Sequence, residues 1–178
     1  YFLSPQECRE IHQFRHKIYC ERLGFEDKRS DGLEQDCFDE RSNHIGLTHS
    51  ETGNVVGCAR NINCHSSQEL LPIETFLDRQ ACASEYHPAK FNRENICEIS
   101  RLAVDCDYQK SKDKASIVEH QIAQYLSFYL VYKCLALAAN VKRPHVFLLC
   151  EPKLIRFMKI AGMKLEIIGG YVAHKGLR

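Results

Sequence analysis

Two charged residues stand inside a short apolar run, and their types and spacing are suited to acid–base chemistry. The run Ile96–Val104 is rich in Ile, Leu and Val, which predicts a buried strand. It contains Glu98 and Arg101, and burying either charge is costly unless it is paired or has a task. Side chains three apart on a regular strand face opposite sides, so the two share one site only if a bulge re-aims one of them. The alternative is a strand whose charges reach opposite solvated edges.

A second group of charged residues precedes this strand. Residues 26–40 form a polar, turn-rich stretch that contains Glu34, Asp36 and Asp39. Arg60 follows on the apolar face of a predicted strand, where an arginine is more often paired than free. Asp36 and Asp39 are the carboxylates available for a bidentate pair with it. The alternative is that the acidic stretch is a solvated loop.

A third set lies on a predicted N-terminal helix. Ser4 and Glu7 frame a proline at the first helical position, which predicts a capping box, and Gly24 is a plausible stop. Arg15 and Tyr19 are four residues apart and therefore share a face of the helix. A chemical role for Arg15 needs a carboxylate from elsewhere in the chain. Without one, Arg15 is a solvated helix charge.

Three lysines, Lys110, Lys112 and Lys114, precede a long predicted helix over residues 115–140. Helix N-termini attract anions because their first N–H groups are unpaired and the helix dipole is positive there. The lysines fit a phosphate or the acidic surface of a carrier protein, or they form a solvated charged loop. The segment has no glycine-rich phosphate loop.

The elements that must position these residues alternate between helices and strands. A hairpin is predicted at 43–48 and 54–62 because Ser50–Gly53 forms a turn signal between two strand patterns. The order predicts an α+β fold, a mixed sheet with helices on both faces, in a single domain over residues 1–178. The remaining predicted elements are a strand at 146–150, a helix at 151–161 and a strand pair at 163–168 and 171–174.

Composition narrows the functional classes. A net charge of +1 gives no global attraction to nucleic acid, and no apolar run reaches the length of a membrane span. The ten cysteines include no Cys-x-x-Cys pair and no zinc-type spacing, so no metal site is predicted. We interpret them as reduced thiols of a cytoplasmic protein. The alternative is a metal site or a disulfide framework.

The charged residues form an ordered pattern: Arg15-x3-Tyr19-x5-Phe25, Glu34-x-Asp36-x2-Asp39, Val56-Gly57-x2-Arg60 and Glu98-x2-Arg101. This pattern resembles that of a known family, the acyl-homoserine-lactone (autoinducer) synthases. It is closer still to their relatives, the long-chain N-acyl amino acid synthases and exosortase-associated acyltransferases. Phe25 stands where autoinducer synthases usually have tryptophan, which favours an amino acid over S-adenosylmethionine as acceptor.

The resemblance implies a GNAT-like α/β/α sandwich. In that fold a bulged central strand diverges from its neighbour, and the pantetheine arm of the donor lies in the gap. It implies no tightly bound cofactor, with acyl carrier protein as donor. Acyl-CoA is possible, but the usual CoA-pyrophosphate signature is degraded in residues 109–115.

The implied function is transfer of a long-chain acyl group from acyl carrier protein to the amino group of an amino acid or related amine. The alternatives are an acyl-homoserine-lactone synthase and a non-catalytic binding module for acyl chains or carrier protein. Glu98 is the predicted base and Glu34 the second candidate, and backbone N–H groups near 100–102 are the predicted oxyanion donors. Ser100 and Arg101 are also predicted as catalytic, with Arg101 in the ion-pair cluster that would shape the acceptor pocket. Lys110, Lys112 and Lys114 would dock the carrier. The predicted substrate-binding residues are Arg15, Tyr19, Phe25, Asp36, Asp39, Arg60, Leu102, Val104, Phe147 and Leu149.

Overall fold

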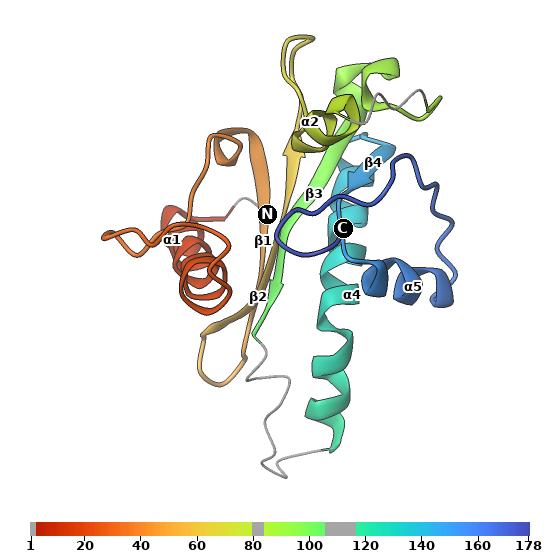
Figure 1. Cartoon of the computed structure of the whole chain (residues 1–178). Helices are drawn as coiled ribbons and strands as arrows, with labels where there is room; N and C mark the ends of the chain where they lie inside the picture. Colours follow the sequence, from red (N-terminus) through yellow and green to blue (C-terminus); the bar gives the residue numbers. More distant parts are fainter. Residues whose placement is uncertain (1–2, 80–83, 106–116) are drawn as a thin grey trace. The chain divides into compact units, whose positions relative to one another are not determined.

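The computed structural model describes residues 3–79, 84–105 and 117–178 (Figure 1). The chain divides into two compact units. The first comprises Tyr1–Arg60 and Arg101–Cys134, and the second comprises Asn61–Ser100 and Leu135–Arg178. The single domain over residues 1–178 stays a prediction. The three lysines predicted to dock a carrier protein, at 110, 112 and 114, lie outside the described residues.

The first unit begins with helix α1, Pro5–Arg15, and its predicted capping box is confirmed. The Glu7 N–H donates to Ser4 Oγ at 3.3 Å, and the Ser4 N–H donates to Glu7 Oε2 at 2.7 Å. The predicted stop at Gly24 is confirmed, because the helical stretch continues through His16–Arg22 to the C-cap Leu23, and Gly24 follows with a φ of 63°. The sequence did not indicate that His16–Arg22 would be a π-helix. This wider turn includes Tyr19, and such turns are frequent at functional sites.

The four strands belong to one mixed sheet with the hydrogen-bonded order β1-β2-β3-β4. Strands β1, Ser42–Thr48, and β2, Val55–Asn63, form the predicted hairpin, closed by the His49 N–H donating to the Asn54 carbonyl at 2.9 Å. Strand β3 is Ile96–Val104, and β4 is His145–Leu148. The β3–β4 pair is parallel, as in sheets that need a long crossover connection.

Strand β3 contains the predicted irregularity. Arg101 has a φ of 49°, a left-handed conformation inside a strand and a feature of β-bulges. The paired register of β3 with β4 runs from Ile96 opposite His145 to Ile99 opposite Leu148, and so stops before Arg101. The predicted kink is therefore present at Arg101.

Helices pack on the strands of the first unit through close approaches at two glycines. A Cβ on Gly46 of β1 would lie 3.2 Å from Ile11 Cδ1 of α1, and one on Gly57 of β2 would lie 3.2 Å from Leu130 Cδ1. Leu130 belongs to α4, Ile117–Asn140. Figure 1 shows α1 and α4 on opposite faces of these strands. The core cluster on the α1 side is made of Ile11, Phe14, Ile18, Cys58 and Ala103.

The second unit holds α2, Pro72–Arg79, and α5, Pro152–Ile160. The strand pair predicted at 163–168 and 171–174 does not form, and one isolated bridge joins Ala173 to Leu177. Ile167 and Tyr171 are 66% and 70% exposed, so this segment lacks the buried face that a strand pair needs.

Among the described residues, no helix combines the length and the apolarity required to cross a membrane. The eight cysteines in this part of the chain are free thiols. Four of them are fully buried, where a thiol packs as a small apolar group. These four are Cys58, Cys64, Cys97 and Cys134.

Candidate active site

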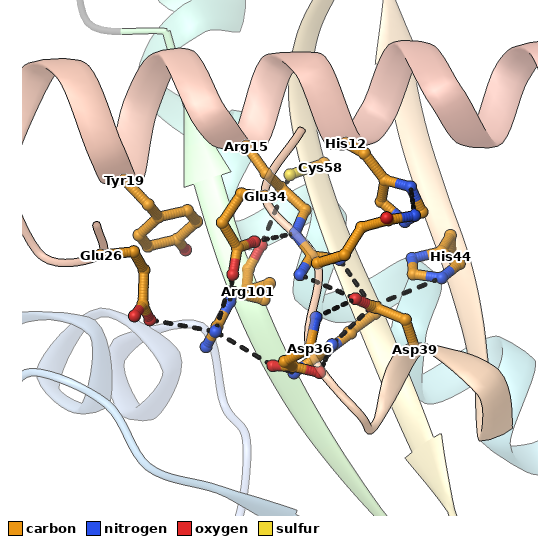
Figure 2. Close-up of polar contacts among 12 residues, drawn as sticks. His12, Arg15, Tyr19, Glu26, Glu34, Asp36, Asp39, His44, Cys58 and Arg101 are labelled. Atoms are coloured by element: carbon orange, nitrogen blue, oxygen red, sulfur yellow. Dashed lines mark hydrogen bonds and ion pairs between the residues drawn. The ribbon is translucent and has the colours of Figure 1, made fainter. Parts of the chain in front are cut away.

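Charged side chains from four parts of the first unit meet in one network (Figure 2). Its guanidinium groups come from the C-terminal end of α1, from β2 and from the kink of β3. Its carboxylates come from the acidic stretch that precedes β1, so the alternative of a solvated loop was wrong. The members of this ion-pair network are Arg15, Arg60, Arg101, Glu26, Glu34, Asp36 and Asp39.

Arg15 joins two of the carboxylates. Its Nε donates to Glu34 Oε2, and its Nη1 and Nη2 donate to the two oxygens of Asp39 at 2.7 and 3.2 Å. The guanidinium is 1% exposed. A planar guanidinium suits this two-sided, bidentate geometry, which a lysine could not reproduce.

Arg60 forms the pair that its place on an apolar strand face predicted. Its Nη1 and Nη2 donate to Asp36 Oδ1 and Oδ2, each at 2.7 Å, and Nη1 also reaches Asp39 Oδ1. Because Asp39 accepts from both Arg15 and Arg60, it links the two arginines. The contact prediction is confirmed, whereas the role in substrate binding stays a prediction.

Arg101 extends the network from the kink in β3. Its Nη2 donates to Glu34 Oε1 at 2.9 Å, to Glu26 Oε1 at 3.0 Å and to Asp36 Oδ2 at 3.0 Å. Its Cζ lies 5.5 Å from the centre of the Tyr19 ring, within cation–π range. Arg101 thereby connects the acidic stretch with the π-helix and β3.

Side chain–backbone turns hold the acidic stretch in place. The Leu33 N–H donates to Asp31 Oδ1 at 3.0 Å, and the Phe38 N–H donates to Asp36 Oδ1 at 2.9 Å, which are Asx turns. The Asp36 N–H donates to Asp39 Oδ2 at 2.8 Å. The aspartates therefore shape their own loop while they bind the arginines.

The network has a buried end and an exposed end. Arg101, at the exposed end, is the guanidinium that solvent and small molecules can reach. The side chains of the buried end are 1–10% exposed: Arg15, Arg60, Glu34 and Asp39. Those of the exposed end are 20–26% exposed: Arg101, Asp36 and Glu26.

The arginines keep the buried carboxylates ionised. Burial alone would raise the pKa of Glu34, but hydrogen bonds from Arg101 and Arg15 outweigh it and hold that pKa below its usual value. Burial opposes the arginines at Asp39 as well, and Arg15 and Arg60 keep its pKa well below the ordinary range. Glu34 is therefore a weak proton acceptor at neutral pH.

The sequence analysis did not predict a role for two histidines that lie beside the buried end. The His12 and His44 rings lie edge to face, 5.1 Å apart, and His44 Nε2 is 3.7 Å from Asp39 Oδ1. Donor atoms of His12, His44 and Asp39 lie within 4.8 Å of one another, as in a metal site. The carboxylate of Asp39 is already bound by Arg15 and Arg60, and two guanidinium charges repel a cation.

Glu98 lies in the second unit, on β3, and is 3% exposed. Its Oε2 accepts the N–H of Ile73 in the first turn of α2 at 2.8 Å, a favourable place for a carboxylate. Glu74 closes the same turn by accepting the Leu71 N–H at 2.7 Å. Arg93 binds Glu74 through two contacts of 2.7 and 2.9 Å. The Glu98 carboxylate therefore lies at the N-terminus of α2, which the Glu74–Arg93 ion pair also stabilises.

The predicted acyl-chain residues occupy strands or their ends. Leu102 is half-buried and Val104 is buried in β3. Phe147 is buried in β4, with its ring 6.0 Å from that of Phe91. The strand predicted up to residue 150 ends at Leu148, so Leu149 follows it. Their contact with an acyl chain stays a prediction.

The remaining predicted residues flank the network. Phe25 is half-buried, and its N–H donates to the Tyr19 carbonyl at 2.8 Å. Ser100 precedes the kink and is half-buried. Glu26 was missed because its contact with Arg101 depends on the turn at Gly24, whose φ is 63°. The signal available in the sequence was its place directly after Phe25 in the acidic stretch.

Comparison with known proteins identifies the family of the chain. The family model of the GNAT acetyltransferase domain matches residues 14–118, more than half of the chain. An acyl-homoserine-lactone synthase of Aeromonas hydrophila is 33% identical over 98 residues, which are 55% of this chain and 44% of that protein. The match therefore spans less than half of that relative's length.

Solved structures extend the likeness in fold to almost the whole chain. The acyl-homoserine-lactone synthase LasI superposes with a TM-score of 0.70 at 16% identity, covering 99% of this chain and 81% of its own. FeeM, an N-acyl amino acid synthase from uncultured soil microbes, gives a TM-score of 0.61 at 17% identity, covering 98% and 86%. At such identities the likeness shows the fold alone, and it confirms the predicted GNAT-like sheet with helices.

Proposed function

The chain belongs to the GNAT acetyltransferase family, and from this premise we propose that it moves a long-chain acyl group from acyl carrier protein to the amino group of an amino acid. The amine nitrogen attacks the thioester carbon, the C–S bond breaks, and the pantetheine thiol leaves with a proton. The amine must lose a proton, the tetrahedral oxyanion needs donors, and both substrates must be held together.

The exposed end of the network is the observation that carries this proposal. There the Arg101 guanidinium stands between the carboxylates of Glu26 and Asp36, at 3.0 Å from each. An amino acid carries one ammonium and one carboxylate, which match this alternation of charges. Its ammonium would bind the Glu26 and Asp36 side, and its carboxylate would bind Arg101. The partly exposed side chains can exchange partners for a ligand without unfolding the buried end.

Glu98 is our candidate for the general base. Both oxygens of Glu34 accept from guanidinium groups, and its pKa is held low, which leaves it little affinity for a proton. The Glu98 carboxylate instead accepts a neutral backbone N–H from Ile73 through Oε2. Glu98 lies three residues before the kink at Arg101, on the same strand β3. Glu34 is better suited to positioning Arg101.

Backbone N–H groups around Arg101 are our candidates for oxyanion donors. A left-handed residue inside a strand turns its adjacent peptide groups out of the regular ladder. N–H groups that are already oriented toward the oxyanion position stabilise the developing negative charge, because they need not reorganise in the transition state. We assign the acyl chain to Leu102, Val104, Phe147 and Leu149, and carrier docking to the lysines at 110, 112 and 114.

An acyl-homoserine-lactone synthase is the second candidate function. It is favoured by the 33% identity to the Aeromonas hydrophila protein of that name. The two functions differ in the acceptor: S-adenosylmethionine for the lactone, an amino acid for the N-acyl product. S-adenosylmethionine also carries an ammonium and a carboxylate, so the charges at the exposed end fit both.

A product assay separates these functions. The purified chain is incubated with a long-chain acyl–acyl carrier protein, and either an amino acid mixture or S-adenosylmethionine, and products are identified by mass spectrometry. We expect N-acyl amino acids. Acyl-homoserine lactone alone would favour the second function. The same incubations are repeated with long-chain acyl-CoA as donor. Product formed only from acyl-CoA would correct the donor, whereas both donors left intact with both acceptors would overturn both functions and favour a binding module.

A further inference from the structure

The kink at Arg101 is a strained conformation that its surroundings must maintain. A non-glycine residue with a φ of 49° places its Cβ close to the following carbonyl, which disfavours the left-handed region. Lys142 and Lys175 share this property but lie outside the strands, whereas Arg101 lies inside β3. A strained backbone conformation of this kind persists only where contacts with several neighbouring groups hold it in place.

The hydroxyl of Tyr19 binds one peptide group next to the kink. Its OH donates to the Leu102 carbonyl oxygen at 2.9 Å, while its ring lies beside the Arg101 guanidinium. Burial raises the pKa of the phenol, so the OH keeps its proton and remains a donor at neutral pH. The π-helix carries Tyr19 to this point from the end of α1.

The thiol of Cys58 binds the neighbouring peptide groups. Its Sγ donates to the Arg101 carbonyl oxygen at 3.5 Å, and the Ala103 N–H hydrogen-bonds to the same sulfur. Cys58 is 0% exposed, and burial raises the pKa of its thiol to about 12. The sulfur therefore stays protonated and bridges the irregular part of β3 from β2.

These contacts fix the directions in which the N–H groups point. In a planar trans peptide the C=O and N–H bonds point in opposite directions. Holding the Arg101 carbonyl against Cys58 therefore turns the Leu102 N–H away from the thiol. Holding the Leu102 carbonyl against Tyr19 sets the direction of the Ala103 N–H in the same way, and this N–H reaches the Cys58 sulfur.

We propose that Tyr19 and Cys58 are positioning residues that together hold the strained peptide groups of 101–103 and thereby aim the Leu102 N–H at the thioester oxygen. This proposal rests on the proposed acyl transfer. Neither side chain touches the reacting atoms. Because the hydroxyl and the thiol act on adjacent peptide groups, losing either one lets the kink relax toward a regular strand.

The test compares Tyr19→Phe, Cys58→Ala and Cys58→Ser with matched controls. Tyr132→Phe removes a hydroxyl from an exposed tyrosine of α4, and Cys134→Ala removes a thiol that is also 0% exposed. Steady-state kinetics are measured for both substrates. Hydrogen exchange of the backbone amides in 101–104 is followed in the same proteins.

We expect Tyr19→Phe and Cys58→Ala to lower kcat about five- to tenfold, the loss of one positioned hydrogen bond, with each KM changed less than about twofold. Amide exchange in 101–104 should rise in both. Cys58→Ser keeps a donor and should recover most of the lost kcat. The two control variants should retain wild-type kcat, although Cys134→Ala loses stability.

Unchanged kcat and exchange in Tyr19→Phe and Cys58→Ala would overturn the proposal, as would equal losses of kcat in the two controls. The failure of acyl transfer is recognised separately, because wild-type protein would then form no product. In that case the catalytic part of the proposal falls with it. Amide exchange then decides by itself whether the two side chains hold the kink.

Discussion

The two ends of the ion-pair network contain the same kinds of groups but differ in their surroundings. At the buried end Arg15 and Asp39 have all their partners inside the protein, with side-chain exposures of 1% and 10%. At the exposed end Arg101 and Glu26 have exposures of 20% and 26%. Water competes for partners only at the exposed end, so only these groups can release a protein contact and bind a ligand.

The difference shows how one ion-pair network can combine a buried part that holds the fold with a part that is open to solvent. Removing one member of a buried ion pair leaves an uncompensated charge, which costs far more than the pair itself contributes. Near the surface, water solvates the charge that is left, so the same change costs less free energy. The buried end therefore sets a rigid frame, and the exposed end presents charge at the kink of β3.

The largest effect is expected at the buried end. Arg15→Met removes the cation that binds Glu34 and Asp39, so we expect the free energy of unfolding to fall by about 3–5 kcal/mol in urea denaturation. The matched control is Arg29→Met. Arg29 is 49% exposed and pairs with Asp31, so its loss should cost less than about 1 kcal/mol. Equal effects of the two substitutions would remove the distinction between the ends.

The second prediction separates the two candidate bases. Glu98→Gln keeps the shape of the side chain but cannot accept the proton, so kcat should fall about 10²–10⁴-fold in the product assay. Glu34→Gln should chiefly lower the urea midpoint, because both of its oxygens bind arginines. The reverse result would assign the base to the network: near-normal turnover in Glu98→Gln and its loss in folded Glu34→Gln.

The third prediction concerns pH. Burial lowers the pKa of His44 from 6.5 to about 4, against the opposing charge of Asp39. Between pH 6.5 and 4, His44 is protonated in the unfolded chain but remains neutral in the folded protein. The free energy of unfolding should therefore fall by up to about 3 kcal/mol as the pH is lowered through this range. His44→Gln should remove most of this slope in urea titrations, whereas the exposed control His65→Gln should not.

The network carboxylates titrate in a different window. Their folded pKa values are depressed, so their contribution is complete above the unfolded values of 4.5 for Glu34 and 3.8 for Asp39. It is lost only as the pH falls through the lower folded values. A slope between pH 6.5 and 4.5 that persists in His44→Gln would contradict the assignment to His44 and point to its neighbour His12, whose pKa burial also lowers.

A smaller effect is expected from Glu26→Gln. Glu26 contacts Arg101 at the exposed end, so neutralising it should raise the acceptor KM about three- to tenfold. The donor KM and the urea midpoint should change little. Glu40→Gln removes a carboxylate from an exposed residue of the same acidic stretch and serves as the control. A rise in donor KM instead would place the donor at this end.

The local signals in the sequence predicted the elements that carry the network. The Ser4–Glu7 capping box marked the start of α1, and the Ser50–Gly53 turn signal between two strand patterns marked the hairpin of β1 and β2. The cost of burying an unpaired guanidinium predicted a partner for Arg60. These predictions depend on short-range patterns or on one general rule, and both can be applied without knowing tertiary structure.

Other features depend on tertiary packing that no local pattern records. Ile18 of the π-helix packs in the same core cluster as Ile11 and Phe14 of α1, so apolar spacing does not distinguish the π-helix from a continued α-helix. Cys58 resembled any small core residue, yet it bridges the kink of β3. The apolar residues at 163–174 suggested strands, but exposed Ile167 and Tyr171 lack a surface to cover.

One measurement tests the division between the two ends most directly: acceptor KM and urea midpoint for Asp39→Asn and Asp36→Asn, the same substitution at each end. Asp39 accepts from Arg15 and Arg60 at 10% exposure, and Asp36 accepts from Arg60 and Arg101 at 24%. We predict that Asp39→Asn gives the larger drop in urea midpoint and Asp36→Asn the larger rise in acceptor KM. A larger rise in acceptor KM from Asp39→Asn, with Asp36→Asn affecting stability alone, would contradict the account.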